Sequence, residues 1–120
     1  MHCHFVFYDL VRNFQNKAAV EYMYSLDHLK RTIQPYEFYL REQGHSKFKR
    51  SGKWVEAGLC PFHNDRNTGS FYFDIESGAY TCFSCGKKGG DIISFTQNKY
   101  DLSFKEALSK LRKEWGVYDY

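Results

Sequence analysis

Two short pairs of metal-binding residue types constrain this chain more than any other feature of its sequence. Two residues separate Cys60 from His63, two separate Cys82 from Cys85, and eighteen residues lie between the pairs. Zinc prefers four soft or borderline ligands in a tetrahedron, and a two-residue gap lets each pair occupy one edge of it. The spacing therefore predicts one zinc ion held by these four side chains. The alternative is that three buried cysteines and a core histidine are unrelated, which leaves their shared spacing unexplained.

The predicted zinc is structural, because four protein ligands complete its coordination and leave no position for a water molecule. Its binding would contribute folding free energy on the order of 10 kcal/mol, so we expect the metal-free region to be largely unfolded. Four cysteines are too few and too unevenly spaced for a secreted disulfide framework. No signal peptide or membrane-spanning run is visible. We therefore expect a cytoplasmic protein with no membrane partner.

The hydrophobic pattern predicts an α+β fold, in which N- and C-terminal helices bracket a small antiparallel zinc-ribbon sheet. The length of 120 residues suits one domain, which we place at residues 25–117, after an N-terminal extension of unclear role (1–24) and before a short tail (118–120). Helices are expected from Ser25, as N-cap, to Thr32, then over 35–43, 92–98 and 103–115, with strands over 70–75 and 79–83. Residues 45–60 are expected to form two further strands around a turn at 51–52.

Several motifs in this order resemble the N-terminal zinc-binding domain of bacterial and phage DNA primases. The sequence CPFHND begins at Cys60, SF follows at Ser70, YTCFSCG begins at Tyr80, and GGDIISF begins at Gly89. The resemblance covers roughly residues 25–117 and includes the paired helices before the ribbon and the LSFKEA helix after it. The chain departs from the family in having Gly69 where a proline is usual. It also ends soon after the domain, with no room for the catalytic core, so we expect no enzyme activity from it alone.

The resemblance implies recognition of single-stranded template DNA, in support of RNA primer initiation by a separate primase or polymerase domain or chain. Exposed aromatic side chains on strands can stack on unpaired bases, while nearby Lys and Arg follow the phosphates. The candidate stacking residues are Trp54, Tyr72 and Tyr80, and Phe62, Phe71, Phe73 and Phe83 are assigned to the core. The candidate phosphate contacts are Lys47, Lys49, Arg50, Lys53, Arg66, Lys87 and Lys88. The Asp65 carboxylate could accept a hydrogen bond from a base or cap its own loop.

Two other functions remain open from the sequence. The net charge of +3 is modest, and clusters of lysine also suit an ordinary solvated surface. The ribbon could therefore serve as a protein-interaction or regulatory module of a mobile element or phage without a role in priming. An autonomous enzyme is the remotest alternative, because the zinc site is closed and the sequence shows no paired-carboxylate motif.

Overall fold

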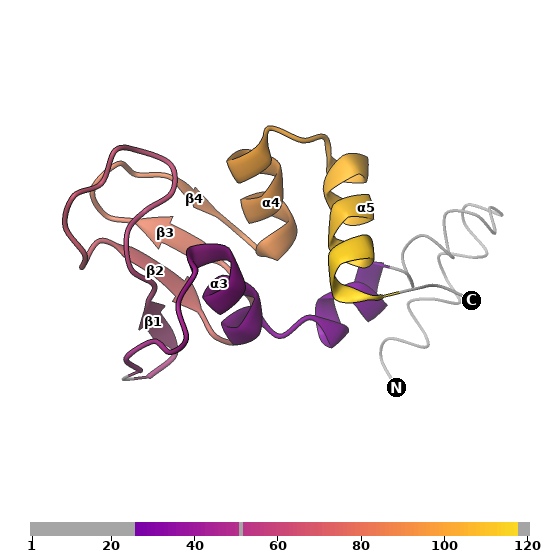
Figure 1. Ribbon diagram of the computed structural model, residues 1–120, viewed down its shortest axis with the longest axis horizontal. Coiled ribbons are helices and arrows are strands. Elements are labelled where there is room, and N and C mark those ends of the chain that lie inside the picture. The colour runs from indigo at the N-terminus through magenta and orange to yellow at the C-terminus, as the bar shows by residue number, and fades with distance from the viewer. Residues whose placement is uncertain (1–25, 51, 118–120) are drawn as a thin grey trace, which may run out of the picture.

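The computed structural model describes residues 26–50 and 52–117, which form an α+β fold as predicted (Figure 1). Residues 26–32 are helical. The other helices are α3 (Pro35–Gln43), α4 (Ile92–Tyr100) and α5 (Phe104–Trp115). The strands are β1 (Trp54–Glu56), β2 (Phe71–Asp74), β3 (Tyr80–Cys82) and β4 (Lys88–Gly89). Within the described segments no helix combines the length and apolar character that a membrane crossing requires.

The four strands form one antiparallel sheet in the order β1-β2-β3-β4. Directly paired residues share a face of an antiparallel sheet, and successive residues alternate between faces. The register therefore assigns every strand residue to one of two faces. The inner face carries Val55, Phe71, Phe73, Tyr80, Cys82 and Gly89. The outer face carries Trp54, Glu56, Tyr72, Asp74, Thr81 and Lys88.

Helices α3 and α4 cover the inner face with an interlocked set of aromatic rings (Figure 1). Tyr39 of α3 stacks on Phe73 at a centroid distance of 4.4 Å and meets Phe95 of α4 edge-on at 4.9 Å. The buried Tyr39 hydroxyl donates a hydrogen bond to the carbonyl of Gly78, 2.7 Å away in the turn between β2 and β3. This contact ties α3 directly to the hairpin that precedes the second cysteine pair.

The helix ends follow the predicted capping chemistry. Pro35 occupies the first turn of α3, and Gly44 ends that helix in the left-handed conformation (φ 67°). The Asp91 carboxylate accepts a 2.8 Å hydrogen bond from Ser94 N at the start of α4. Ser103 and Glu106 form the predicted capping box. The predicted N-cap Ser25 lies outside the described residues. Helix α4 continues two residues beyond the predicted end, to Tyr100.

Two charged side chains near the end of α3 connect it to the C-terminal helices. The Arg41 guanidinium lies 3.7 Å from the centroid of the Trp115 ring and donates to the Glu114 carbonyl. The neighbouring Glu42 carboxylate accepts from Lys99 Nζ at 3.0 Å and from the Tyr100 hydroxyl at 2.7 Å. Arg–aromatic contact and paired charges of this kind hold the helices in a fixed arrangement.

The predicted strand immediately after α3 is wrong. Residues 45–50 form no strand, and the Phe48 amide donates to the Tyr36 hydroxyl at 3.1 Å instead of to a strand partner. The Phe48 side chain is buried against Phe73 of the inner face and Tyr36 of α3, so this segment packs on the core and does not pair as a strand. The predicted second strand of this region is present as β1.

Candidate metal centre and surrounding surface

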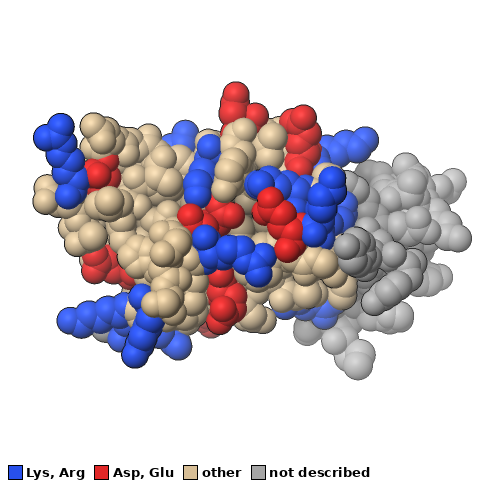
Figure 2. All heavy atoms as spheres, viewed as in Figure 1, with Lys and Arg blue, Asp and Glu red and all other residues tan. Residues whose placement is uncertain are grey.

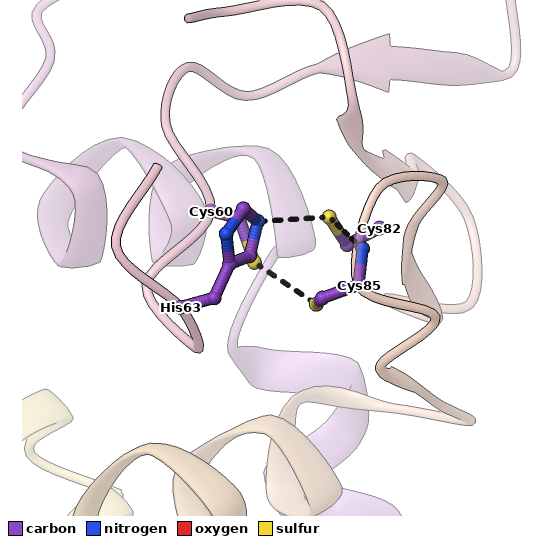
Figure 3. A group of neighbouring side chains, drawn as sticks. All are labelled: Cys60, His63, Cys82 and Cys85. Carbon is purple, nitrogen blue, oxygen red and sulfur yellow. Dashed lines mark hydrogen bonds between the residues drawn. The ribbon is translucent and has the colours of Figure 1, made fainter. Parts of the chain in front are cut away.

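The four predicted zinc ligands converge in space, although they come from two segments of the chain. Cys60 and His63 lie in the loop after β1, whereas Cys82 ends β3 and Cys85 lies in the turn after it (Figure 3). Their ligand atoms all lie within 4.8 Å of one another. The β2–β3 hairpin brings the pairs together, because it returns the chain from the first pair to the second.

The distances within this cluster fit a tetrahedral zinc ion. The Sγ atoms of Cys60 and Cys85 are 3.9 Å apart, and Cys82 Sγ lies 3.5 Å from Nε2 of His63. Zn–S bonds of about 2.3 Å and Zn–N bonds of about 2.0 Å at tetrahedral angles place sulfur atoms about 3.8 Å apart and sulfur about 3.5 Å from nitrogen. Three thiols and one imidazole are also the donor types that zinc prefers. The residues present therefore fit one structural zinc.

Backbone amides further prepare the sulfur atoms for this role. Phe62 N donates to Cys60 Sγ at 3.4 Å, and Cys85 N donates to Cys82 Sγ at 3.5 Å. Burial raises the pKa of the Cys60 thiol to about 12. Burial also raises the pKa of Cys82, but donation from the backbone N–H groups of Cys85 and Ser84 outweighs it and lowers that pKa to about 7. Since a ligating cysteine must be a thiolate, zinc binding would release protons from the cluster.

Asp65 borders the cluster and caps its own loop. Its Oδ2 accepts from Cys60 N at 2.9 Å and lies 3.9 Å from His63 Nε2, and its Oδ1 accepts from Asn67 N at 3.4 Å. Donation from the Cys60 amide is the main cause that lowers the pKa of this carboxyl. Of the two interpretations open from the sequence, this geometry supports the loop cap.

The outer face of the sheet exposes aromatic side chains, some of them close to the metal centre. Trp54 is 45% exposed, and Tyr72 is half-buried on the neighbouring strand. Phe83 follows Cys82 directly, is 74% exposed, and meets the Tyr72 ring edge-on at 5.6 Å. Thr81 and Lys88 complete the row across the sheet from Tyr72. The outer face thus presents Tyr72, Phe83 and Lys88 towards one edge, with the Glu56 carboxylate at the other end of the row and Trp54 on the same edge strand as Glu56.

Two aromatic assignments from the sequence are reversed. Tyr80, expected to stack on bases, is 1% exposed on the inner face, and its hydroxyl accepts a 2.6 Å hydrogen bond from the Asn98 amide. Phe83, expected in the core, is instead the most exposed of the large apolar side chains described. Strand alternation contains the missing signal: Cys82 turns inward to the metal cluster, so its neighbours Thr81 and Phe83 must turn outward.

The predicted phosphate contacts do not share one surface. Lys88 lies on the outer face. The Lys87 Nζ atom instead lies 6.0 Å from the centroid of the Phe62 ring, which packs with the inner-face residue Tyr80. Lys53 Nζ is 3.3 Å from Asp74 and 3.6 Å from Glu76, so this amine joins β1 to the next hairpin. Arg66 is exposed in the loop after the first ligand pair, Cys60 and His63. The remaining cations, Lys47, Lys49 and Arg50, line a separate hollow.

The sheet, the two ligand pairs and their tetrahedral spacing define a zinc ribbon. The chain belongs to the CHC2 zinc finger family, the zinc ribbon of DnaG, whose match covers residues 21–118. Sequence and structural relatives agree with this assignment.

The DNA primase of Deinococcus radiodurans is 46% identical over 67 residues, which are 56% of this chain and 11% of that protein. The DNA primase of Thermotoga maritima is 46% identical over 59 residues, 49% of this chain and 10% of that protein. The crystal structure of the zinc-binding and RNA polymerase domains of Aquifex aeolicus primase matches with a TM-score of 0.61 and 29% identity. That match covers 80% of this chain and 22% of the Aquifex chain. The chain therefore corresponds to a small, zinc-binding part of these primases.

Proposed function

We propose that this zinc ribbon recognises single-stranded template DNA and supports primer initiation by a primase or polymerase catalytic domain, in the same protein or in a partner. The observation that carries the proposal is the outer face, where Tyr72 and Phe83 expose aromatic rings near Lys88 and Trp54 exposes a third ring on the opposite edge strand. Membership of a family found in DNA primases gives this surface its expected ligand.

Unpaired bases can stack on these rings irrespective of their sequence, because every base has an aromatic face. The Phe83 and Tyr72 rings meet edge-on, so they present faces of different orientation to the bases of a single-stranded DNA. Lys88 on the same face can pair with a phosphate. When bound, the zinc ion would cross-link the two ligand pairs. Because its ligand Cys82 directly precedes Phe83, the metal would also fix the direction in which the Phe83 ring points.

The proposal assigns template recognition, and not nucleotidyl transfer, to these residues. Among residues 26–50 and 52–117, the zinc cluster is the one group of three or more His, Cys, Asp or Glu residues that could hold a metal. Its four protein ligands leave no coordination position for a nucleotide. Primer synthesis from ribonucleotides by the purified 120-residue chain would contradict this assignment. The proposal also places the protein in the cytoplasm, with its template.

The first test is fluorescence anisotropy of a short labelled oligonucleotide, titrated with zinc-loaded protein at several salt concentrations. With Lys88 as the cation of the outer-face strands, one or two phosphate contacts predict a slope of log K against log salt of about −0.7 to −1.4. Unlabelled duplex should compete less well than unlabelled single strand, because paired bases are not free to stack. Failure to bind at high micromolar protein would refute independent template binding and favour a protein-interaction or regulatory module.

A second test asks whether the chain supports priming. The RNA polymerase domain of Aquifex aeolicus primase, without its zinc-binding domain, would be supplied with this chain in trans. The proposal predicts that added chain increases template-dependent primer synthesis, and that a Phe83→Ala variant does so less well. No increase with either form would contradict a role in initiation with that catalytic partner.

A further inference from the structure

A basic hollow lies at the edge of the domain, apart from the metal centre. It has a volume of about 690 Å³, within the roughly 300–1,000 Å³ typical of small-molecule sites. The segment after α3 forms one wall, and the beginning of α3 forms the other. The lining residues are Gln34, Tyr36, Glu37, Lys47, Phe48, Lys49, Arg50 and Ile75.

This hollow is not part of the outer face. Phe48, in its wall, packs against Phe73 of the inner face, with ring centroids 5.7 Å apart. The Tyr36 ring, on the opposite wall, also contacts Phe73, at 6.4 Å. The hollow therefore opens beside the inner layer, whereas Tyr72 and Trp54 point to the other side of the sheet. Figure 2 shows basic side chains gathered at the lower left, near the segment that leads into β1 in Figure 1.

The charge around the hollow favours an anion. Lys47, Lys49 and Arg50 are exposed, and none has an Asp or Glu within salt-bridge distance among the described residues. Glu37 is the one carboxylate in the lining. Lys53, the next cation along the described chain, is instead held by Asp74 and Glu76. Three cations from four consecutive residues thus remain available for a ligand.

The other side of the hollow, at the beginning of α3, is partly aromatic and carries the Glu37 carboxylate. Tyr36, Phe48 and Ile75 give it an apolar floor, and the Gln34 amide gives it a hydrogen-bonding group. A ligand suited to both sides carries several negative charges close together at one end and a flat, partly apolar group at the other. Three cations within four residues match a triphosphate, whose charges lie close together, better than a strand, which carries one charge per nucleotide.

We propose that this hollow binds a nucleoside triphosphate, with the phosphate chain on Lys47, Lys49 and Arg50 and the base or sugar over Tyr36 and Ile75. Arg and Lys bind phosphate oxygens through charge-assisted hydrogen bonds, which are stronger than neutral ones. The site extends the proposed template-binding function, because it would place a nucleotide on the same small domain as the template strand. It does not depend on that function, since the two surfaces share no residue.

The test is calorimetric titration of the zinc-loaded chain with ATP and with adenosine, in excess Mg²⁺ so that the nucleotide does not compete for zinc. ATP should bind and adenosine should not. Lys49→Glu combined with Arg50→Glu should raise the Kd for ATP about tenfold or more, since each removes a charged contact. The matched control reverses two exposed lysines of α5, Lys105→Glu with Lys113→Glu, and should leave the Kd unchanged. Circular dichroism and zinc content confirm that each variant is folded.

Absence of ATP binding at millimolar concentration would overturn the proposal. ATP binding that the Lys49→Glu/Arg50→Glu variant of the hollow does not weaken would overturn it as well. A neutral Lys47→Gln variant gives the same answer if the charge reversals do not fold. A different outcome is that an oligonucleotide without a triphosphate displaces ATP and loses its own affinity in the Lys49→Glu/Arg50→Glu variant. That result would identify a nucleic-acid backbone as the occupant of the hollow and refute nucleotide binding there. Loss of oligonucleotide binding in Phe83→Ala, with ATP binding retained, would show that the two sites are independent.

Discussion

The exposed Phe83 ring gives the sharpest test of the outer face as a nucleic-acid surface. Replacing it with alanine removes an aromatic ring that is already 74% exposed, so little buried apolar area is lost. Surface substitutions of this kind change the free energy of unfolding by about 0.5 kcal/mol or less. The zinc ligands on either side, Cys82 and Cys85, are untouched. We therefore expect Phe83→Ala to fold and to bind zinc as the wild type does.

Its effect on single-stranded DNA should be much larger. A base stacked on an aromatic side chain contributes about 1–3 kcal/mol by alanine substitution. Because each 1.4 kcal/mol corresponds to a factor of ten, the Kd should rise roughly 5- to 140-fold. The salt dependence should stay the same, since no phosphate contact is removed. Phe83→Trp should retain most of the affinity.

Anisotropy titration with a labelled oligonucleotide measures this change, and thermal unfolding measures stability in parallel. Phe104→Ala is the matched control, because Phe104 is also a partly exposed phenylalanine (37%) but lies on α5, away from the sheet (Figure 1). The control should bind DNA with unchanged affinity. A Phe83→Ala protein that is folded, loaded with zinc and unaltered in Kd would refute stacking at this position.

Three further predictions concern stability. Cys82→Ser should lose zinc and the cooperative unfolding transition, because the metal contributes on the order of 10 kcal/mol of folding free energy; a variant that keeps both zinc and fold would contradict a structural metal. Tyr39→Phe should cost about 1–2 kcal/mol, since it removes the buried bond to the Gly78 carbonyl, and should lower Tm by about 4–8 °C per kcal/mol; an unchanged Tm refutes it. Burial raises the pKa of Asp74, but the N–H groups of residues 76 and 77 and the Lys53 amine outweigh burial and hold the pKa below its usual value. The carboxylate therefore stabilises the fold above its unfolded pKa of about 4 and loses this effect as the pH falls through the lower folded pKa. In urea unfolding, the deficit of Asp74→Asn should stay constant from about pH 8 to 5, and a deficit that shrinks within that range would contradict the assignment.

The metal site and the helix ends could be predicted because their signals are local. Ligand spacing, the Asp91 cap and the capping box at Ser103 each depend on a few neighbouring residues, and the structure confirms them. The aromatic-rich strand at Phe71 also forms as expected. Such features need no knowledge of what lies opposite them in the fold.

The exchange of Tyr80 and Phe83 follows from strand alternation, but the other features that the sequence does not reveal depend on contacts between distant residues. The segment at Phe48 has the composition of a strand, but the Tyr36 hydroxyl takes its amide. Lys53 appears free in the sequence because its partner Asp74 lies on the next strand of the sheet. The inward-facing Tyr80 hydroxyl accepts a hydrogen bond from the amide of Asn98, eighteen residues later, which satisfies it in the core. The hollow beside Lys49 is assembled from three separate segments and leaves no motif in the sequence.

The positions of the two tryptophans give this small protein a pair of internal optical reporters. Trp54 stands on the outer face, where its indole is partly in water and where a stacked base would quench its emission. Trp115 lies under the Arg41 guanidinium at the junction of α3 and α5, so its emission follows the docking of those helices. A Trp54→Phe variant would isolate the second signal. Binding at the sheet and opening of the helical half could then be followed separately, in unlabelled protein and in a single experiment.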